Sequence, residues 1–581
     1  MVRKALALVM SATIVMSGCN SALTAIPGPP TPPAATPTTA SAAIKHVVVI
    51  FDENISFDHY FGTYPNAANT DGQSFTAATG TPIPDNYISN PSLLTANPNL
   101  NPANSIITSG TVISSPSNPF RLSADQAGTG DQDHSYTPEQ AAFDNGKMDL
   151  FPLSVGTPDG QPLQTQTNAP SLANTQSLTM AYYDGNTVTA LWNYAQQYAM
   201  NDHSFGSTFG ASTQGAINLV SGQTNGVASF SAGAASGTVD DGQGGTTLTN
   251  DEDPTGDVCS SASANVQMNA PKGKNINIGD LLNTGVNGTP VTWGFFEGGF
   301  DLSITNTSNG ITTTGCNRST GAVNIPGHPL KADYIPHHEP FQYYASTANP
   351  MHNRPTAAIG TTDAANHQYD TLDFNTALAA GNLPSVSFLK APGYQDGHAG
   401  YSDPLDEQTW LVNEINAIEA SSFWPNTAII IAYDDSDGWY DHVSDLVNGS
   451  ATAQDVLNGP GSNLCISATA AAAALPGPNS NGKPVAGRCG HGPRLPLLVL
   501  SPWAKKNYID TTPTDQASIT HFIEDVFLGG ARIGNGSFDT GAGTINAMFD
   551  FSNGATPPNP TPLYLSPTTG KVCSPATAAC K

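Results

Sequence analysis

Oxygen-bearing side chains directly follow two apolar runs that lie far apart in the sequence. The run Val47–Phe51 ends in Asp52-Glu53-Asn54, and the run Ala428–Tyr433 ends in Asp434-Asp435. Carboxylate and amide oxygens are the ligands that hard divalent cations prefer. Either group alone is equally well interpreted as ordinary loop acids or helix caps, but the two together indicate one metal ion held between them.

A hydroxyl that could attack an electrophile belongs to Ser212, which follows the glycine-rich turn at Phe209-Gly210 and precedes the apolar stretch Ala216–Val220. A serine at such a place is commonly the N-cap of a helix. The place also suits phosphate, because free N–H groups and the positive end of the dipole at a helix N-terminus attract anions. The two interpretations are compatible.

Histidines accompany these groups at His134, at the adjacent pair His337-His338 and at His398. A single histidine in a loop is more often structural. The pair lacks the i, i+4 spacing of a helical zinc site, so phosphate binding and protonation of a leaving group fit it better. Arg494 precedes another apolar run and is a candidate for phosphate binding, with a surface ion pair as the alternative.

The elements that must position these side chains follow from the apolar pattern. Uninterrupted apolar runs indicate strands buried on both faces of a mostly parallel sheet, and ligands bind at the carboxyl ends of such strands. We expect an α/β fold, a three-layer α/β/α sandwich with long loop inserts. The further strands expected are Val291–Phe296, Ser385–Leu389 and Leu495–Leu500, and the helices are Pro138–Asn145, Thr187–Asn201, Ile278–Thr284, Pro404–Glu419 and Pro513–Leu528.

Three segments of the chain resemble one known family. They are Glu53-Asn54 with Ser56-Phe57-Asp58-His59-Tyr60-Phe61-Gly62, then Pro336-His337-His338-Glu339-Pro340-Phe341, and Tyr433-Asp434-Asp435. Together they resemble the bacterial phosphoesterase family of acid phosphatases and C-type phospholipases. The resemblance covers Lys45 to Phe549 and implies an alkaline-phosphatase-like fold.

The resemblance implies roles for individual residues. One divalent metal ion of the hard type, Mg, Ca, Mn or Fe, would be held by Glu53, Asn54, Ser212, Asp434 and Asp435. Ser212 would be the nucleophile that forms a phosphoserine, with Thr213 as the alternative if the turn aligns one residue later. The residues that would bind phosphate oxygens are His134, His337, His338, His398 and Arg494, and one of these histidines would protonate the leaving alkoxide.

Phosphoester hydrolysis is therefore expected, most simply the hydrolysis of phosphomonoesters by an acid phosphatase. The larger phospholipases of the family tend to read Glu-His-Asn-Arg where this chain has Asp52-Glu53-Asn54-Ile55, and they carry extra C-terminal β domains. The alternatives are a phospholipase C that cleaves phospholipid head groups and a non-catalytic surface lipoprotein that binds phosphorylated ligands. Because histidine has a reference pKa of about 6.5, we expect an activity maximum on the acid side of neutral.

Composition and the N-terminus indicate partners and location. The 581 residues carry a formal net charge of −27, which argues against nucleic acid as a partner. Arg3-Lys4 and the apolar Ala5–Met16 are typical of a signal peptide, and Ser17-Gly18-Cys19 is typical of a lipoprotein processing site, with cleavage after Ala25 as the alternative. We expect an exported protein that is periplasmic, attached to the outer membrane by an N-terminal lipid, or secreted.

The chain divides into a lipoprotein signal peptide (1–19), a Pro-, Thr- and Ala-rich tether (20–44) and a single catalytic phosphoesterase domain (45–581) with inserts near 66–130, 223–257 and 443–489. Of the 7 cysteines, six remain after Cys19, and six allow 15 pairings. In an oxidising compartment, pairing of sequence neighbours would give Cys259–Cys316, Cys465–Cys489 and Cys573–Cys580.

Overall fold

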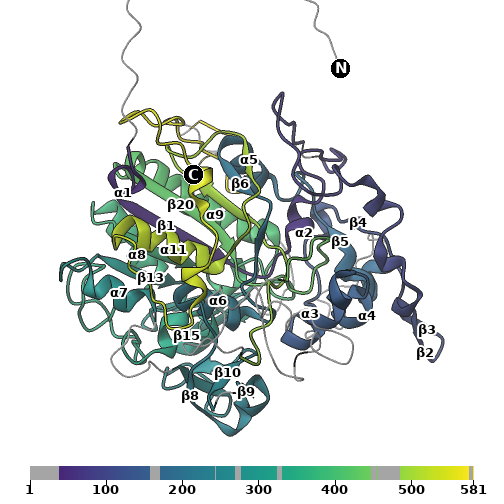
Figure 1. The fold of residues 1–581 in the computed structure, drawn as a ribbon, viewed down its shortest axis with the longest axis horizontal. Helices are drawn as coiled ribbons and strands as arrows, with labels where there is room; N and C mark the ends of the chain where they lie inside the picture. Colours follow the sequence, from purple (N-terminus) through teal and green to yellow (C-terminus); the bar gives the residue numbers. More distant parts are fainter. Residues whose placement is uncertain are drawn as a thin grey trace, which may run out of the picture.

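Strands β1 (His46–Asp52) and β20 (Thr427–Tyr433) lie side by side in the main sheet and run parallel (Figure 1), with Val48 opposite Ile429. Every side chain of β20 is buried, as is every side chain of β1 from Val47 onward. Apolar side chains without alternation suit strands that are covered on both faces. The two predicted buried strands are confirmed.

The main sheet of the described chain has eight strands, and all but one run in the same direction. Strand β21 pairs antiparallel with both of its neighbours, whereas the other neighbouring strands pair in parallel. The predicted α/β class with a mostly parallel sheet is therefore confirmed. The order is β18 (Gln368–Asp370), β13 (Trp293–Glu297), β19 (Val386–Lys390), β1, β20, β21 (Leu497–Leu500), β6 (Ala199–Asn201) and β22 (Tyr508–Asp510).

The longer helices form two groups, and the helices within each group contact one another. One group consists of α5 (Thr189–Gln197), α8 (Thr371–Ala379) and α9 (Pro404–Glu419), and the other consists of α6 (Ser212–Ser221), α7 (Ile278–Thr284) and α11 (Gln516–Phe527). Helices α7 and α9 have the bounds that the sequence predicts. The predicted helix over 187–201 is wrong at its end, because the chain leaves α5 at Gln197 and residues 199–201 pair with β21 and β22 as strand β6.

Shorter elements surround the sheet. Figure 1 shows α3, α4 and the hairpin of β2 and β3 at one end of the molecule, and β8, β9 and β10 along another side. The short helices are α1 (Ala40–Ala43), α2 (Phe57–Phe61), α3 (Tyr136–Phe143) and α4 (Phe151–Ser154). The short strands are β2 (Ile106–Thr108), β3 (Thr111–Ser114), β4 (Phe120–Arg121), β5 (Ala181–Tyr182), β7 (Ser204–Phe205), β8 (Val227–Phe230), β9 (Thr238–Asp240), β10 (Thr246–Leu248), β11 (Asp253–Pro254), β12 (Asn265–Met268), β14 (Thr305–Ser308), β15 (Ile311–Thr314), β16 (Ser319–Thr320), β17 (Lys331–Ala332) and β23 (Thr514–Asp515).

The computed structural model describes residues 38–72, 74–156, 171–242, 244–268, 277–322, 330–446, 455, 485–574 and 580. The expected signal peptide, most of the expected tether and most of the insert near 443–489 lie outside these ranges. Within them, no helix has both the length and the apolar character needed to cross a bilayer.

Two of the predicted disulfides are confirmed. Cys259 is bonded to Cys316 and Cys573 to Cys580. Cys489 is also disulfide-bonded, and the partner that the prediction assigns to it, Cys465, lies outside the described residues.

Candidate active site

The two central strands end together, and hydrogen bonds join the segments that follow them. The backbone N–H of Asn54 donates to Asp434 Oδ1 at 3.0 Å, and that of Ile55 donates to the carbonyl of Asp435 at 2.9 Å. Asn54 has a left-handed backbone (φ 56°), which asparagine tolerates better than most residues. As a result, Glu53, Asn54, Asp434 and Asp435 lie at one edge of the sheet, as the sequence predicts.

Ser212 places its hydroxyl within this group. The residue is 2% exposed and begins α6, and its Oγ lies 3.1 Å from Glu53 Oε2, 3.1 Å from Asp435 Oδ2 and 3.4 Å from Asn54 Oδ1. The N-cap residue of α6 is Ala211, so Ser212 does not cap the helix. Its hydroxyl instead faces the carboxylates.

Thr213, the alternative nucleophile, has a different environment. Its hydroxyl donates to Asp251 Oδ1 at 2.8 Å, and its backbone N–H donates to the same oxygen at 2.9 Å. The Thr213 hydroxyl is thus held by one carboxylate outside the group around Glu53. The geometry favours Ser212 over Thr213 as the nucleophile.

A glycine allows α6 to approach the end of β20 this closely. Gly215 lies one turn after the start of α6, and a Cβ at this position would overlap the carbonyl oxygen of Asp434. Main chain therefore packs directly on main chain here. This contact sets the spacing between Ser212 and the carboxylates that follow β20.

Lys390, the last residue of β19, carries a buried positive charge into the same group. Its ammonium contacts Glu53 Oε1 and lies 3.6 Å from Asp434 Oδ2. Burial disfavours the ammonium, but the carboxylates of Glu53 and Asp434 outweigh burial and raise the pKa of Lys390. Lys390 therefore stays charged and neutralises part of the acidic group.

The remaining negative charge fits a hard divalent cation. Burial and then the neighbouring charge of Asp434 raise the pKa of Glu53, and burial likewise raises the pKa of Asp435. Asp434 Oδ2 is buried and makes no hydrogen bond within the described chain. Carboxylate, amide and hydroxyl oxygens that converge in this way form a donor set suited to Mg, Ca, Mn or Fe.

His134 and His398 lie beside this group, with ring centroids 6.0 Å apart. His134 Nε2 is 4.0 Å from Asp435 Oδ2, and its Nδ1 is 2.8 Å from the carbonyl of Gln132. Burial opposes protonation of His134, but Asp435 and then Asp131 outweigh burial and raise its pKa. Burial and then the charge of His134 lower the pKa of His398. The nearby carboxylates therefore favour the cationic form of His134, whereas burial favours the neutral form of His398.

His337 and His338 approach from another segment, a short 3-10 helix (Pro336–His338). His338 Nδ1 lies 3.4 Å from Glu53 Oε1, and its buried Nε2 has no hydrogen-bond partner in the described chain. Burial and then the charge of Lys390 lower the pKa of His338. His337 packs edge-on against His338 and points Nδ1 at Asp253 Oδ1, 3.3 Å away. The structure thus brings the predicted histidines to the same group as Ser212.

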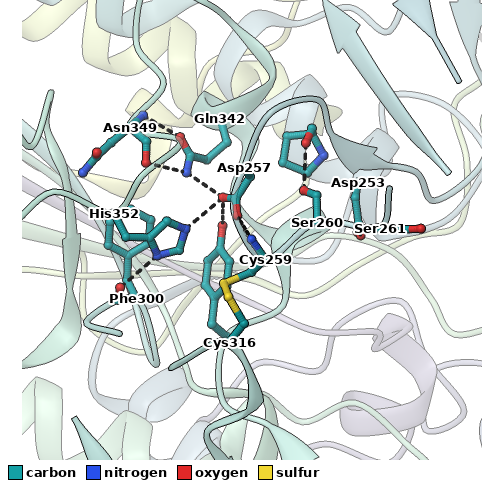
Figure 2. The surroundings of a disulfide bond; sticks show 12 residues. Asp253, Asp257, Cys259, Ser260, Ser261, Phe300, Cys316, Gln342, Asn349 and His352 are labelled. Atoms are coloured by element: carbon teal, nitrogen blue, oxygen red, sulfur yellow. Dashed lines mark hydrogen bonds and ion pairs between the residues drawn. A yellow bond between two sulfur atoms is a disulfide. The ribbon is translucent and has the colours of Figure 1, made fainter. Parts of the chain in front are cut away.

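Asp257 holds both sides of the segment that carries the histidine pair (Figure 2). Its Oδ2 accepts hydrogen bonds from Tyr334 OH at 2.8 Å and from Gln342 Nε2 at 2.7 Å, and it lies 3.0 Å from His352 Nε2. Tyr334 precedes the pair in the sequence and Gln342 follows it. One buried carboxylate therefore ties down the segment on either side of the two rings.

A disulfide anchors the turn that presents Asp257. The backbone N–H of Cys259 donates to Asp257 Oδ1 at 2.7 Å, and Cys259 is bonded to Cys316 (Figure 2). Asp253, which faces His337, lies just before this turn. The Cys259–Cys316 bond thereby supports the position of the histidine pair from outside the sheet.

Arg494 does not belong to the site, and the interpretation that it binds phosphate is not supported. Its guanidinium is fully buried and lies 3.0 Å from Asp58 Oδ1 and 3.1 Å from Asp441 Oδ1. It also donates to the carbonyl oxygens of Asp85 and Asp202. The alternative, an ion pair at the surface, is also wrong, because this ion pair is internal and joins α2 to the loop before β21.

One family model matches this chain over most of its length. The model of the family described as the phosphoesterase family matches residues 44–528. The chain belongs to the phosphoesterase family. Its site residues from Glu53 to Asp435 all fall within the matched range.

Curated relatives of this phosphoesterase-family chain are named as phospholipases C. It is 29% identical over 154 residues to the non-hemolytic phospholipase C of Pseudomonas aeruginosa, a match over 26% of this chain and 21% of the relative. It is 28% identical over 196 residues to phospholipase C A of Mycobacterium tuberculosis, over 33% and 34% of the two chains. The non-specific phospholipase C6 of Arabidopsis thaliana is 27% identical over 169 residues, over 27% of each chain. The chain thus spans only about a fifth to a third of the length of these relatives.

The sequence analysis missed several residues that line or support the candidate active site of this chain. Lys390 follows a predicted strand that neighbours β1, and a lysine at the carboxyl end of a buried strand was the available signal. Asp251, which binds Thr213, and Asp257 lie in an insert with no periodic pattern, so nothing local marked them.

We predict that Asp257→Asn will loosen the histidine pair of this phosphoesterase-family protein. The substitution replaces one accepting oxygen with an NH2 group, so at least one buried donor that faces Asp257 loses its acceptor. Such a loss typically costs about 1–3 kcal/mol of unfolding free energy. The unfolding temperature and the rate of phosphoester hydrolysis should therefore both fall, as measured by calorimetry and phosphate release. Asp240→Asn, at an exposed carboxylate, serves as the control and should change neither. An unchanged unfolding temperature in Asp257→Asn would contradict the proposed role of Asp257.

We predict that deprotonation of His442 lowers the stability of the folded protein as the pH becomes alkaline. Its Nδ1 lies 2.6 Å from Asp58 Oδ2 and its Nε2 lies 3.2 Å from Asp85 Oδ1. Burial opposes its charge, but Asp58 and Asp85 outweigh burial and raise the pKa of His442 to about 10. Since this pKa lies above the unfolded value of about 6.5, the stabilisation is complete below pH 6.5 and is lost as the pH rises toward 10.

The measurement is the unfolding temperature between pH 6 and pH 10. It should fall in the unsubstituted protein and fall less steeply in His442→Gln. His46→Gln is the matched control, because burial lowers the pKa of His46 and so moves its titration away from alkaline pH. Parallel curves for His442→Gln and the unsubstituted protein would show that another group carries the alkaline transition.

Proposed function

We propose that the protein is a metal-dependent phosphoester hydrolase that acts through Ser212. The observation that carries the proposal is the position of Ser212 Oγ, 3.1 Å from carboxylate oxygens of both Glu53 and Asp435 at the start of α6. A phosphoryl group at this oxygen would lie at the N-terminus of α6, where the positive end of the helix dipole stabilises anions. Membership of the phosphoesterase family supports the same chemistry.

The residues that would hold one divalent ion are Glu53, Asn54, Ser212, Asp434 and Asp435. When bound, such an ion supplies Lewis-acid chemistry that favours the ionised hydroxyl and screens phosphate charge. Ser212 Oγ then attacks phosphorus, its proton passing to a neighbouring carboxylate, and the bond to the leaving oxygen breaks. His338 and His398 have pKa values lowered by burial and bind as neutral rings, whereas His134 is the cation that can donate a proton to the leaving alkoxide. Water hydrolyses the phosphoserine to release phosphate.

We infer that residues 45–581 form one catalytic domain with the three-layer, alkaline-phosphatase-like arrangement. The two separate groups of contacting helices support this arrangement, because each group would cover one face of the sheet. We also propose that the protein is exported through a signal peptide and attached to a membrane by lipid at Cys19. Disulfides within the described residues support an oxidising compartment.

Within this chemistry we propose a phosphomonoesterase of the acid phosphatase type. The raised pKa of His134, whose Nε2 lies 4.0 Å from Asp435 Oδ2, favours a cation that suits an anionic phosphomonoester. A phospholipase C is the second candidate, and the names of the curated relatives favour it.

We predict that two substitutions will distinguish the role of the nucleophile from the role of the metal ligands. Ser212→Ala should reduce turnover of p-nitrophenyl phosphate by several orders of magnitude and leave most of the bound metal, because it removes the attacking oxygen but none of the carboxylates. Asp434→Asn should lower bound metal and turnover together. Elemental analysis and phosphate release provide the two readouts. Near-normal turnover in Ser212→Ala, with Thr213→Ala inactive instead, would place the nucleophile one residue later.

We predict that p-nitrophenyl phosphate will be hydrolysed faster than phosphatidylcholine at equal concentration, with the maximum of kcat/KM on the acid side of neutral. Mild acid turns the phosphomonoester, whose second pKa is about 6, from a dianion into a monoanion, which the chain's net charge of −27 repels less. Release of phosphate is compared with release of phosphocholine at saturating metal. Preferential cleavage of phosphatidylcholine would replace the phosphatase proposal with the phospholipase C candidate.

A further inference from the structure

Lys331 is a positively charged residue beside the candidate active site for which the mechanism above has no role. It begins the short strand β17, and its Nζ lies 3.8 Å from the ring centroid of Tyr401. Tyr401 in turn stacks on His398, with ring centroids 4.3 Å apart and planes 23° apart. Lys331, Tyr401 and His398 therefore form a continuous stack that ends at the site.

The ammonium of Lys331 is in direct contact with no carboxylate among the described residues. It makes no ion pair or hydrogen bond there, whereas Lys390 is held by Glu53 and Asp434. Contact with an aromatic face stabilises an ammonium without neutralising it. The Tyr401 hydroxyl donates to Asp396 Oδ2 at 3.3 Å, which fixes the ring on which the lysine rests. A preorganised cation is thus available to a ligand.

The charge of Lys331 contributes to the electrostatics of two histidines of the site. Burial lowers its own pKa, while the carboxylates of Asp396, Asp131 and Glu53 oppose that effect. After burial and other cations, Lys331 also contributes to the lowered pKa of His338 and of His398. An anion bound beside these two histidines would therefore also interact with the Lys331 ammonium.

We propose that Lys331 binds a terminal phosphoryl oxygen of the substrate and makes the site prefer phosphomonoesters to phosphodiesters. The inference rests on the proposed hydrolysis and names its substrate class. A monoester carries up to two negative charges near neutral pH, because its second pKa is about 6, whereas a diester carries one. A further cation binds the doubly charged monoester more tightly than the singly charged diester. In a diester the corresponding oxygen is esterified, so it carries no negative charge and cannot accept an ionic hydrogen bond.

The test compares Lys331→Met, which keeps the length of the side chain and removes its charge, with Lys331→Arg, which keeps the charge. Lys505→Met is a matched control, because Lys505 also rests on a tyrosine, with Nζ 4.1 Å from the ring centroid of Tyr508. Lys505 follows β21, the antiparallel strand, and so lies at the opposite edge of the sheet from Glu53 and Asp434.

Two measurements are made on the full, metal-loaded chain. Calorimetry gives the dissociation constant of inorganic phosphate, which should rise about tenfold in Lys331→Met, as expected for the loss of one hydrogen bond from a charged group. Kinetics should show kcat/KM for p-nitrophenyl phosphate falling by a similar factor, with kcat/KM for bis(p-nitrophenyl) phosphate changed less than twofold. Lys331→Arg should recover most of the phosphate affinity, and Lys505→Met should resemble the unsubstituted protein.

An unchanged phosphate affinity in Lys331→Met would overturn the inference. An equal fall in kcat/KM for the monoester and the diester would overturn it too. Unfolding temperatures show whether Lys331→Met is folded, and if it is not, Lys331→Gln takes its place with the same expected result. If the unsubstituted protein hydrolyses neither ester, the proposed function fails, while the calorimetric comparison still decides whether Lys331 binds phosphate.

Discussion

Repulsion among buried carboxylates is the constraint on which the rest of this structure depends. Glu53 and Asp435 lie against the Ser212 hydroxyl, Asp434 shares Lys390 with Glu53, and none of the three carboxylates is more than 3% exposed. Unpaired charge in such a place is costly, so the surrounding structure must supply positive charge. Lys390 provides part of it from β19. The rest fits a hard cation, and only a rigid framework could hold the oxygens together before one binds.

That framework is largely main chain. The parallel pairing of β1 with β20 places Glu53 and Asp434 at neighbouring strand ends, and β19 brings Lys390 alongside β1. Helix α6 rests on the end of β20 through Gly215. Side chains from loops complete the site: the 3-10 helix with His337 and His338 is held on both sides by Asp257, which a disulfide supports.

Local patterns predicted the framework better than the contacts made by loops. The apolar runs identified β1 and β20 because both are buried on two faces, and α9 has its predicted bounds because Asp403 caps it and Pro404 begins it. Strand β6 was missed because three residues that continue a helical apolar pattern are drawn into the sheet by β21 and β22. Lys390, Asp257 and the internal pairing of Arg494 depend on partners distant in the sequence, and no local pattern reports such partners.

The close contact of Gly215 with the Asp434 carbonyl separates the parts of this molecule that can diverge from those that cannot. Main chain sets the spacing of the reacting oxygens, so almost any side chain at position 215 would disturb it. The segments bearing Lys331, His337 and Tyr401 lie outside that contact and can accumulate substitutions independently. A lineage with this architecture can therefore exchange one ester preference for another by remodelling its loops, while inheriting the same reaction centre unchanged.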